Sequence, residues 1–261
     1  MVEPVPEPEP TAASDAQSGR DAAHWAPRVT SLSVDPLLPP GAINLNVEGR
    51  HLSGPIQGFG QMWRKQHRIR LVDAPVMPTE VIRVWKEHFG EFWPSGNRFY
   101  GPLTGLAPGE VAVINLGMPG GTTLSTGVMV LYADDESFSL MTPQGHVFSG
   151  WITFSAFEDA GSTMAQAEIL MRASDPLFEI GMRLMGHRRE NRFWEATLVA
   201  LAARFGVKGV AETHVECIDH QLQWEYATNV RHNSAIRTGI YMGTVPVQKA
   251  VNRLRQRGVL Q

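Results

Sequence analysis

The chain has 261 residues, of which 43% are hydrophobic, so it is long enough to bury a sizeable core in one large domain or two small ones. Its formal net charge of -3 and its pI near 6.3 give no electrostatic reason to expect nucleic acid or an anionic membrane surface as a partner. A single cysteine, Cys217, excludes an internal disulfide framework and fits a cytoplasmic protein. The sequence has neither a secretion signal nor a run of about 18 apolar residues, so we predict no membrane span.

Residues 1–40 are rich in proline and acidic side chains. This composition buries too little apolar surface to offset the loss of chain entropy, so we expect a disordered arm. The remaining chain is expected to divide into a main domain over residues 41–207 and a C-terminal extension over residues 208–261 that packs on it.

The first ordered elements are expected to be a strand and a short helix. Residues 57–72 mix apolar with polar side chains, as in a long, half-exposed strand. Pro78 and Thr79 introduce a helix that carries Trp85, Phe89 and Phe92 at helical spacing. Such an aromatic cluster is more often core than ligand site, although a short aromatic helix can also cover a pocket.

The next hundred residues are typical of antiparallel strands, expected at residues 111–117, 124–133, 138–142, 147–157 and 163–172. The connections are short and rich in turn residues, which favours hairpins over β-α-β units. In the last strand Ala165, Ala167 and Ile169 alternate with Gln166 and Glu168, so that one face of the sheet is apolar.

Residues 175–206 are predicted to form one long amphipathic helix. Asp175 can cap its free N–H groups, Pro176 suits the first helical position, and Gly206 suits the residue that ends it. Apolar residues recur at helical spacing at Leu177, Ile180, Leu184, Trp194, Leu198, Leu201 and Phe205. A curved sheet with one apolar face is completed most simply by laying this helix across it, which predicts an α+β fold.

The middle of this helix interrupts the apolar stripe with His187, Arg188 and Asn191. In one interpretation, Gly181 and Gly186 weaken the helix, and a kink turns these polar groups to solvent. In the other, the polar groups face a cavity beneath the helix and orient an apolar ligand. The rarity of unpaired buried charge favours the first interpretation.

The order of these elements resembles the helix-grip fold of the START, Bet v 1 and polyketide cyclase superfamily (SRPBCC). The resemblance covers residues 57–207 and rests on element order and on the long helix. The stretches 217–224 and 231–239 are similar to segments of uncharacterised bacterial members. The resemblance implies a cavity between sheet and helix that holds lipids, steroids, polyketides or other hydrophobic molecules, with catalysis in some members. The chain departs from small members in the residues after Gly206, expected to cover a cavity mouth or mediate a homodimer.

We predict that apolar walls of this cavity come from Trp63, Trp85, Met129, Leu131, Trp151, Ile169, Met171, Leu184 and Trp194. The predicted orienting groups are His146, His187 and Arg188. Because histidine exchanges a proton near neutral pH, His146 and His187 are also the candidate catalytic residues, with Glu179 and Arg188 as partners on the helix.

Other common chemistry has no support in the sequence. His214, Cys217 and His220 have a suggestive spacing, but on a strand Cys217 would point away from both histidines, so we predict no metal site. The nucleophile elbow, the phosphate loop and the dinucleotide fingerprint are absent from the sequence, and we predict no cofactor.

Three hypotheses follow from the sequence. The first is the binding or transport of a hydrophobic small molecule, lipid or polyketide-like, in the cavity. The second is a cyclase or dehydratase that uses His146 or His187 as a general base. The third is a protein-interaction module whose cavity is filled by its own side chains.

Overall fold

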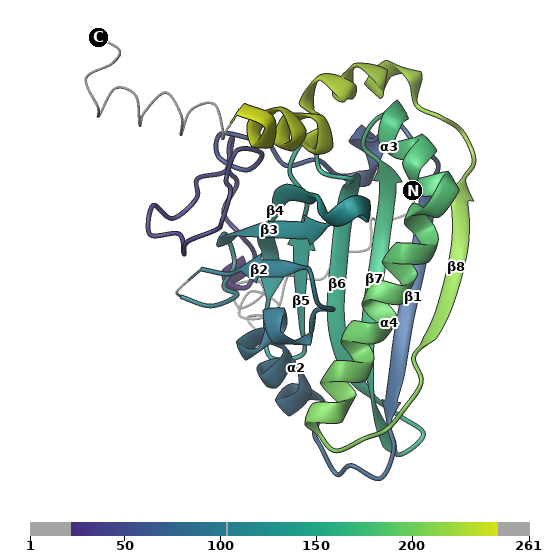
Figure 1. Cartoon of the computed structure of the whole chain (residues 1–261). Helices are drawn as coiled ribbons and strands as arrows, with labels where there is room; N and C mark the ends of the chain where they lie inside the picture. The colour runs from purple at the N-terminus through teal and green to yellow at the C-terminus, as the bar shows by residue number, and fades with distance from the viewer. Residues whose placement is uncertain (1–21, 103, 245–261) are drawn as a thin grey trace, which may run out of the picture.

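A computed structural model describes residues 22–102 and 104–244. Its eight strands form one antiparallel sheet in the order β2-β3-β4-β5-β6-β7-β1-β8 (Figure 1). The strands are β1 Met62–Leu71, β2 Arg98–Tyr100, β3 Val111–Gly117, β4 Thr123–Ala133, β5 Ser137–Met141, β6 Phe148–Asp159, β7 Ser162–Ala173 and β8 Glu212–Asp219. Strands β3 to β7 follow one another as hairpins, which confirms the predicted meander. β1 pairs with β7 and places the first strand next to the last strand of that meander.

Helices cover one side of the sheet, called here the inner face. They are α2 Pro78–Glu87, η2 Phe89–Phe92, α3 Pro176–Gly181, the π-helical turn η4 Met182–Gly186, and α4 His187–Arg204. Figure 1 shows α4 crossing the sheet in front of β6, β7 and β1, with α2 beside it. Trp85 of α2 packs edge-on against Phe154, which also contacts Trp194 of α4. This is the predicted helix-grip fold, with shorter turns at η1 Pro55–Gln57, η3 Pro119–Gly121 and η5 Trp224–His232.

Both ends of the long helix lie where the sequence predicts them. The Asp175 carboxylate accepts hydrogen bonds from the backbone N–H groups of Leu177 (2.9 Å) and Phe178 (3.0 Å). At the other end Gly206 has a φ of 77°, a conformation that favours glycine. Between these ends, however, η4 makes the helix irregular.

The predicted apolar stripe of the long helix is confirmed in the second half of the helix and is wrong in the first half. Trp194, Leu198 and Leu201 are buried, whereas the exposed fractions are 49% at Leu177, 57% at Ile180 and 73% at Leu184. The buried apolar residues of the first half are instead Phe178 and Met182. A π-helical turn contains one extra residue, which rotates the preceding turns by about 100° relative to a regular helix. The sequence pattern assumes an unbroken period and therefore selects the wrong face.

Residues 22–52, called here the N-terminal segment, cover part of the opposite side of the sheet, which is called the outer face. Leu32 and Val34 are buried in a second core, with Val47 and with the outward residues of β3 and β4. The backbone N–H of Ala26 donates to the carbonyl of Leu131. Residues 22–40 thus differ from the expected disordered arm, because their scattered apolar residues find partners on β3 and β4. Residues 1–21 lie outside the described part of the chain.

The C-terminal extension adds β8 to the sheet beside β1, and then crosses above the long helix (Figure 1). The Asn233 side-chain amide donates to the buried Asp175 carboxylate (2.8 Å), and Arg237 donates to the Asn46 side-chain oxygen (2.9 Å). Residues 234–244 are helical. These contacts connect the extension to the start of α3 and to the N-terminal segment. Residues 245–261 of the extension lie outside the described part of the chain.

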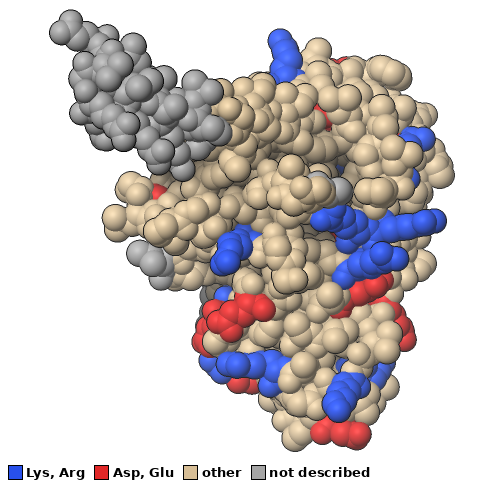
Figure 2. Space-filling model, viewed as in Figure 1, with Lys and Arg blue, Asp and Glu red and all other residues tan. Residues whose placement is uncertain are grey.

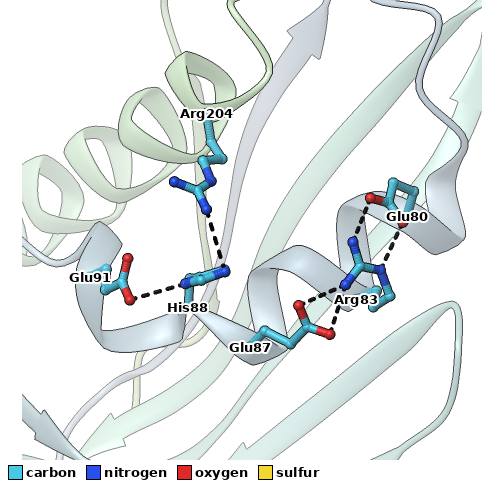
Figure 3. A network of polar contacts seen from close by, with 6 residues as sticks. All are labelled: Glu80, Arg83, Glu87, His88, Glu91 and Arg204. Carbon is cyan, nitrogen blue, oxygen red and sulfur yellow. Dashed lines mark hydrogen bonds and ion pairs between the residues drawn. The ribbon is translucent and has the colours of Figure 1, made fainter.

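A polar network joins the far end of α4 to α2 and η2 (Figure 3). The His88 ring lies between Glu91 (3.0 Å) and the Arg204 guanidinium (3.5 Å). On α2, Arg83 donates to Glu80 and Glu87 on either side of it. Because these groups are largely exposed, we expect the network to contribute little to stability.

Candidate functional site

A cavity of about 310 Å³ lies between the inner face of β3 to β6 and the helix formed by α3, η4 and α4. Most of its lining is apolar: Trp93, Ile114, Leu116, Met118, Val128, Leu140, Val147, Phe148, Ile152, Phe178, Met182, Met185, Phe193 and Trp194. Its polar lining residues are Asn97, Thr142, His146, Arg189 and Glu190. The exposed lining residues include Gly181, Met185 and Arg189, so the cavity opens beside η4.

The strands supply alternate residues to this cavity because successive side chains of a strand point to opposite faces. On β4 the lining residue is Val128, and on β6 the lining residues are Phe148 and Ile152. Their neighbours Met129 and Trp151 therefore point to the outer face, where Met129 is buried in the second core. The long helix contributes Phe178 and Met182 to the cavity. Both side chains face the sheet because Asp175 caps the start of α3 and because η4 shifts the helical phase.

The structure brings two of the predicted site residues, Trp194 and His146, to the cavity. Met129 and Leu131 contact the N-terminal segment on the outer face, and Trp151 also belongs to that side. The sequence shows that side chains alternate between the two faces of these strands. It does not show whether the odd-numbered or the even-numbered residues face the helix.

The other predicted wall residues lie away from the cavity. Trp85, Ile169 and Met171 are fully buried in the main core, beneath α2 and α4. Trp63 packs against His187, with 4.8 Å between the ring centroids. Leu184 is exposed because of the phase shift at η4, and Arg188 is exposed beside it. Glu179 is buried and pairs with Arg183 outside the cavity lining.

His146 is a buried, neutral group in the cavity wall. Its Nδ1 lies 3.1 Å from the carbonyl oxygen of Phe148 and 3.2 Å from the backbone nitrogen of that residue. Burial lowers the pKa of His146 to about 4, so the ring carries no charge near neutral pH. Since Nδ1 is occupied, Nε2 is the nitrogen that can meet a ligand.

His187 has a different environment from the one predicted. It does not line the cavity, and its buried Nδ1 has no hydrogen-bond partner within the described residues. Burial, and then the charges of Lys65 and Arg183, lower its pKa to about 4. The two interpretations of the helix middle therefore each hold in part: Arg188 faces solvent, whereas His187 and Asn191 face β1.

A buried ion pair forms the inner side of the site. Lys65 of β1 is completely buried, and its Nζ pairs with Glu190 Oε2 and donates to Asn191 Oδ1 (2.9 Å). Glu190 Oε1 lies 3.9 Å from His67 Nε2. Burial raises the pKa of Glu190, and the adjacent Lys65 charge opposes that rise. Burial lowers the pKa of His67 to about 4.

Sequence reasoning missed Lys65 and Glu190, although both carried a signal. Lys65 is separated by even steps from the buried Ile69 and Leu71, which places it on the inner face of β1. Glu190 precedes Trp194 by four residues and therefore belongs to the same helix face. Lys65 stands in the sequence among Arg64, Arg68 and Arg70, a basic run typical of a solvent-exposed strand face, and this run concealed the even spacing.

The suggestive spacing on β8 does not assemble a metal site in the structure. Cys217 Sγ lies 3.3 Å from His220 Nδ1. Within residues 22–102 and 104–244, no group of three or more His, Cys, Asp or Glu side chains is placed to hold a metal ion. Over the same residues, no helix combines the length and the apolar character needed to cross a membrane.

Comparison with known proteins gives similarities of fold. No protein-family model and no curated protein matches this chain. Protein Ms6760 from Mycobacterium smegmatis is similar over 55% of this chain and 90% of its own, with a TM-score of 0.39 and 15% identity. The crystal structure of Ara h 8.0201 is similar over 55% of this chain and 97% of its own, with a TM-score of 0.38 and 10% identity.

A third similar structure is the di-domain ARO/CYC StfQ from the steffimycin biosynthetic pathway, with a TM-score of 0.45 and 11% identity. The alignment covers 56% of this chain and 53% of that protein. At these TM-scores and identities the similarities say nothing about a ligand or an activity. The helix-grip fold is defined by the strand order and the long helix of the chain itself.

Proposed function

We propose that this protein binds a small, mostly apolar molecule in the cavity between β3–β6 and the long helix. The observation that carries the proposal is the cavity itself, whose apolar walls are supplied by four strands and the long helix. A volume of about 310 Å³ lies at the lower end of the range of ligand sites. The cavity favours this hypothesis over the third one, which required a cavity filled by its own side chains.

Native mass spectrometry with decanol as the probe tests this proposal. We expect the full-length protein to gain the mass of one decanol. Gly181→Trp should abolish this uptake, because Gly181 lies at the cavity mouth with open space beside it. Leu184→Trp is the matched control, because it adds the same side chain on the same helix but outside the cavity lining. The absence of any uptake by the wild type would contradict the proposal.

A second candidate function is acid–base catalysis on the bound molecule, as in the cyclase or dehydratase hypothesis. The observation that favours it is Glu190, a carboxylate with a raised pKa that lines an apolar cavity. Carboxylates in such surroundings are suited to proton transfer near neutral pH. The catalytic group proposed here is therefore Glu190, with His146 as a hydrogen-bonding group for the substrate.

The probe 5-nitrobenzisoxazole tests for such a base. Its C3 proton would pass to the Glu190 carboxylate while the N–O bond breaks, and the product is a coloured cyanophenolate. We expect Glu190→Gln to lose the reaction, while His146→Gln would retain part of it. A wild-type rate equal to the rate in buffer, or an unchanged rate in Glu190→Gln, would exclude Glu190 as this base.

A further inference from the structure

Three arginines lie close together where the cavity opens. Arg188, Arg189 and Arg192 are exposed residues of the first turns of α4, and Arg189 itself lines the cavity. Figure 2 shows Lys and Arg side chains gathered over the upper part of α4, beside the surface that Figure 1 assigns to α3 and η4. The net charge of -3 conceals this local concentration of positive charge.

These arginines are not neutralised within the protein. Among the described residues, Arg188, Arg189 and Arg192 make no ion pair, and Arg189 donates only to the carbonyl oxygen of Gly117 (2.5 Å). The glutamates of the long helix have other partners. Glu179 pairs with Arg183, Glu190 pairs with Lys65, and Glu195 accepts a hydrogen bond from the Thr213 hydroxyl (2.7 Å).

The cavity therefore has an apolar interior and a cationic rim. Phe178, Met182 and Trp194 contribute to the interior, and Arg189 is the cation among the residues that line it. Guanidinium groups bind carboxylate and phosphate oxygens through charge-assisted hydrogen bonds. An alkyl or aryl group fits the interior, and an anionic head group fits the rim.

We propose that the cavity selects amphiphilic anions, molecules with one apolar tail and one carboxylate or phosphate head group. The tail would lie between the sheet and the long helix, and the head group would accept hydrogen bonds from Arg189. Arg188 and Arg192 would add to the positive potential at the mouth without contacting the tail. This inference rests on the proposed function, because it assumes that the cavity takes up an apolar tail.

Isothermal titration calorimetry with four decyl probes tests the selection: decanoate, decyl phosphate, decanol and decyltrimethylammonium. All are used below their micelle concentrations, at about pH 8, where decanoate is ionised. We expect decanoate and decyl phosphate to bind about tenfold more tightly than decanol, as one charge-assisted hydrogen bond would give. The cationic probe should bind more weakly than decanol. Comparison of the two anions shows whether the carboxylate or the phosphate is preferred.

Variants at Arg189 test whether this residue causes the preference for anionic probes. Arg189→Met should lose the tenfold preference of the anions over decanol, while Arg189→Lys should retain part of it. Arg204→Met removes the same charge from the far end of α4 and should retain the full preference. Decanol binding also reports that each variant is folded with an open cavity.

The outcomes separate this inference from the proposed function. Equal binding of decanoate, decyl phosphate and decanol, or an unchanged preference in Arg189→Met, overturns the selection of anions and leaves the proposed function intact. Failure of all four probes to bind contradicts the proposed function, and this inference with it. Loss of the preference at about 0.5 M salt, with decanol binding unchanged, would further support a charge interaction at the exposed rim.

Discussion

Lys65 is completely buried beneath the long helix, where it pairs with Glu190 in the cavity wall. A buried ion pair costs free energy of desolvation, which its Coulomb attraction and additional hydrogen bonds must offset. Asn191 supplies one such hydrogen bond to Lys65. The pair thus connects the first turn of α4 to the centre of β1.

Lys65→Met is expected to destabilise the protein by about 3–5 kcal/mol, because it leaves the Glu190 carboxylate buried without its partner. The double variant Lys65→Met with Glu190→Gln should recover much of that loss, since it removes the unpaired charge. Urea unfolding at neutral pH measures both free energies of unfolding. If the single and double variants were equally unstable, the ion pair would not be the source of the loss.

His146 gives the stability a pH dependence of known sign. Its pKa is about 4 in the folded protein and about 6.5 in an unfolded chain, so the folded state binds fewer protons between these values. The stability it contributes is complete above the unfolded pKa and is lost as the pH falls toward the folded pKa. His67 and His187 shift in the same direction.

From these pKa values, lowering the pH from 7 to 5 should cost about 2 kcal/mol through His146 alone. His146→Gln cannot titrate, so its free energy of unfolding should fall less over this interval, by about that amount. Urea unfolding at the two pH values gives the comparison, in which all other titrating groups are shared. An identical pH dependence in the wild type and the variant would show that His146 titrates normally.

At the scale of single elements, the π-helical turn η4 determines which residues the long helix presents to the sheet. Its residues Met182, Met185 and Gly186 all line the cavity. π-helical turns within α-helices are frequent at functional sites. η4 therefore connects an irregularity of the backbone to the place where the cavity opens.

Two glycines beside this turn should respond in opposite ways to alanine. A Cβ at Gly181 would meet nothing within 4 Å, and its helical φ of -59° suits alanine, so Gly181→Ala should stabilise the protein by about 1 kcal/mol. A Cβ at Gly186 would lie 2.5 Å from Met182 Sδ, so Gly186→Ala should be destabilising. Thermal unfolding measures both changes, and a gain in stability at Gly186 would contradict this description of η4.

The sequence was sufficient to predict β1, the strands β3 to β7, the ends of the long helix and the fold, because each depends on local spacing and on turn or capping residues. The short strand β2 was not predicted. It was insufficient for most of the cavity lining. Met129 and Trp151 were placed on the wrong face because alternation does not define which parity is inward. Leu184 was placed wrongly because the extra residue of η4 shifts the helical phase. Gly181 and Gly186 indicated a weak point in the helix, but they did not indicate the extra residue of a π-helical turn.

At the scale of the whole molecule, the sheet has a core on each face. The inner core lies under α2 and α4, and the outer core lies under the N-terminal segment. Val113 and Met129 belong to the outer core, while their strand neighbours Ile114 and Val128 line the cavity. The N-terminal segment therefore packs on the backs of the same strands that form the cavity wall.

Leu32→Ala is expected to cost about 2–5 kcal/mol, the usual range for a leucine truncated in a core, because Leu32 is only 2% exposed. Leu37→Ala is the matched control, since Leu37 is 73% exposed and should change the free energy by less than about 0.5 kcal/mol. Urea unfolding of the full-length protein compares them. Equal stability of the two variants would show that the segment does not belong to the core.

The cavity is the central claim, and the methionine methyl groups test it most directly. Met118, Met182 and Met185 line the cavity, whereas Met129 is buried in the outer core. In a titration of protein labelled with ¹³C at the methionine methyl groups, decanol is predicted to shift the NMR signals of the three lining residues and to leave that of Met129 in place. Unshifted signals from all three, or a largest shift at Met129, would contradict the account.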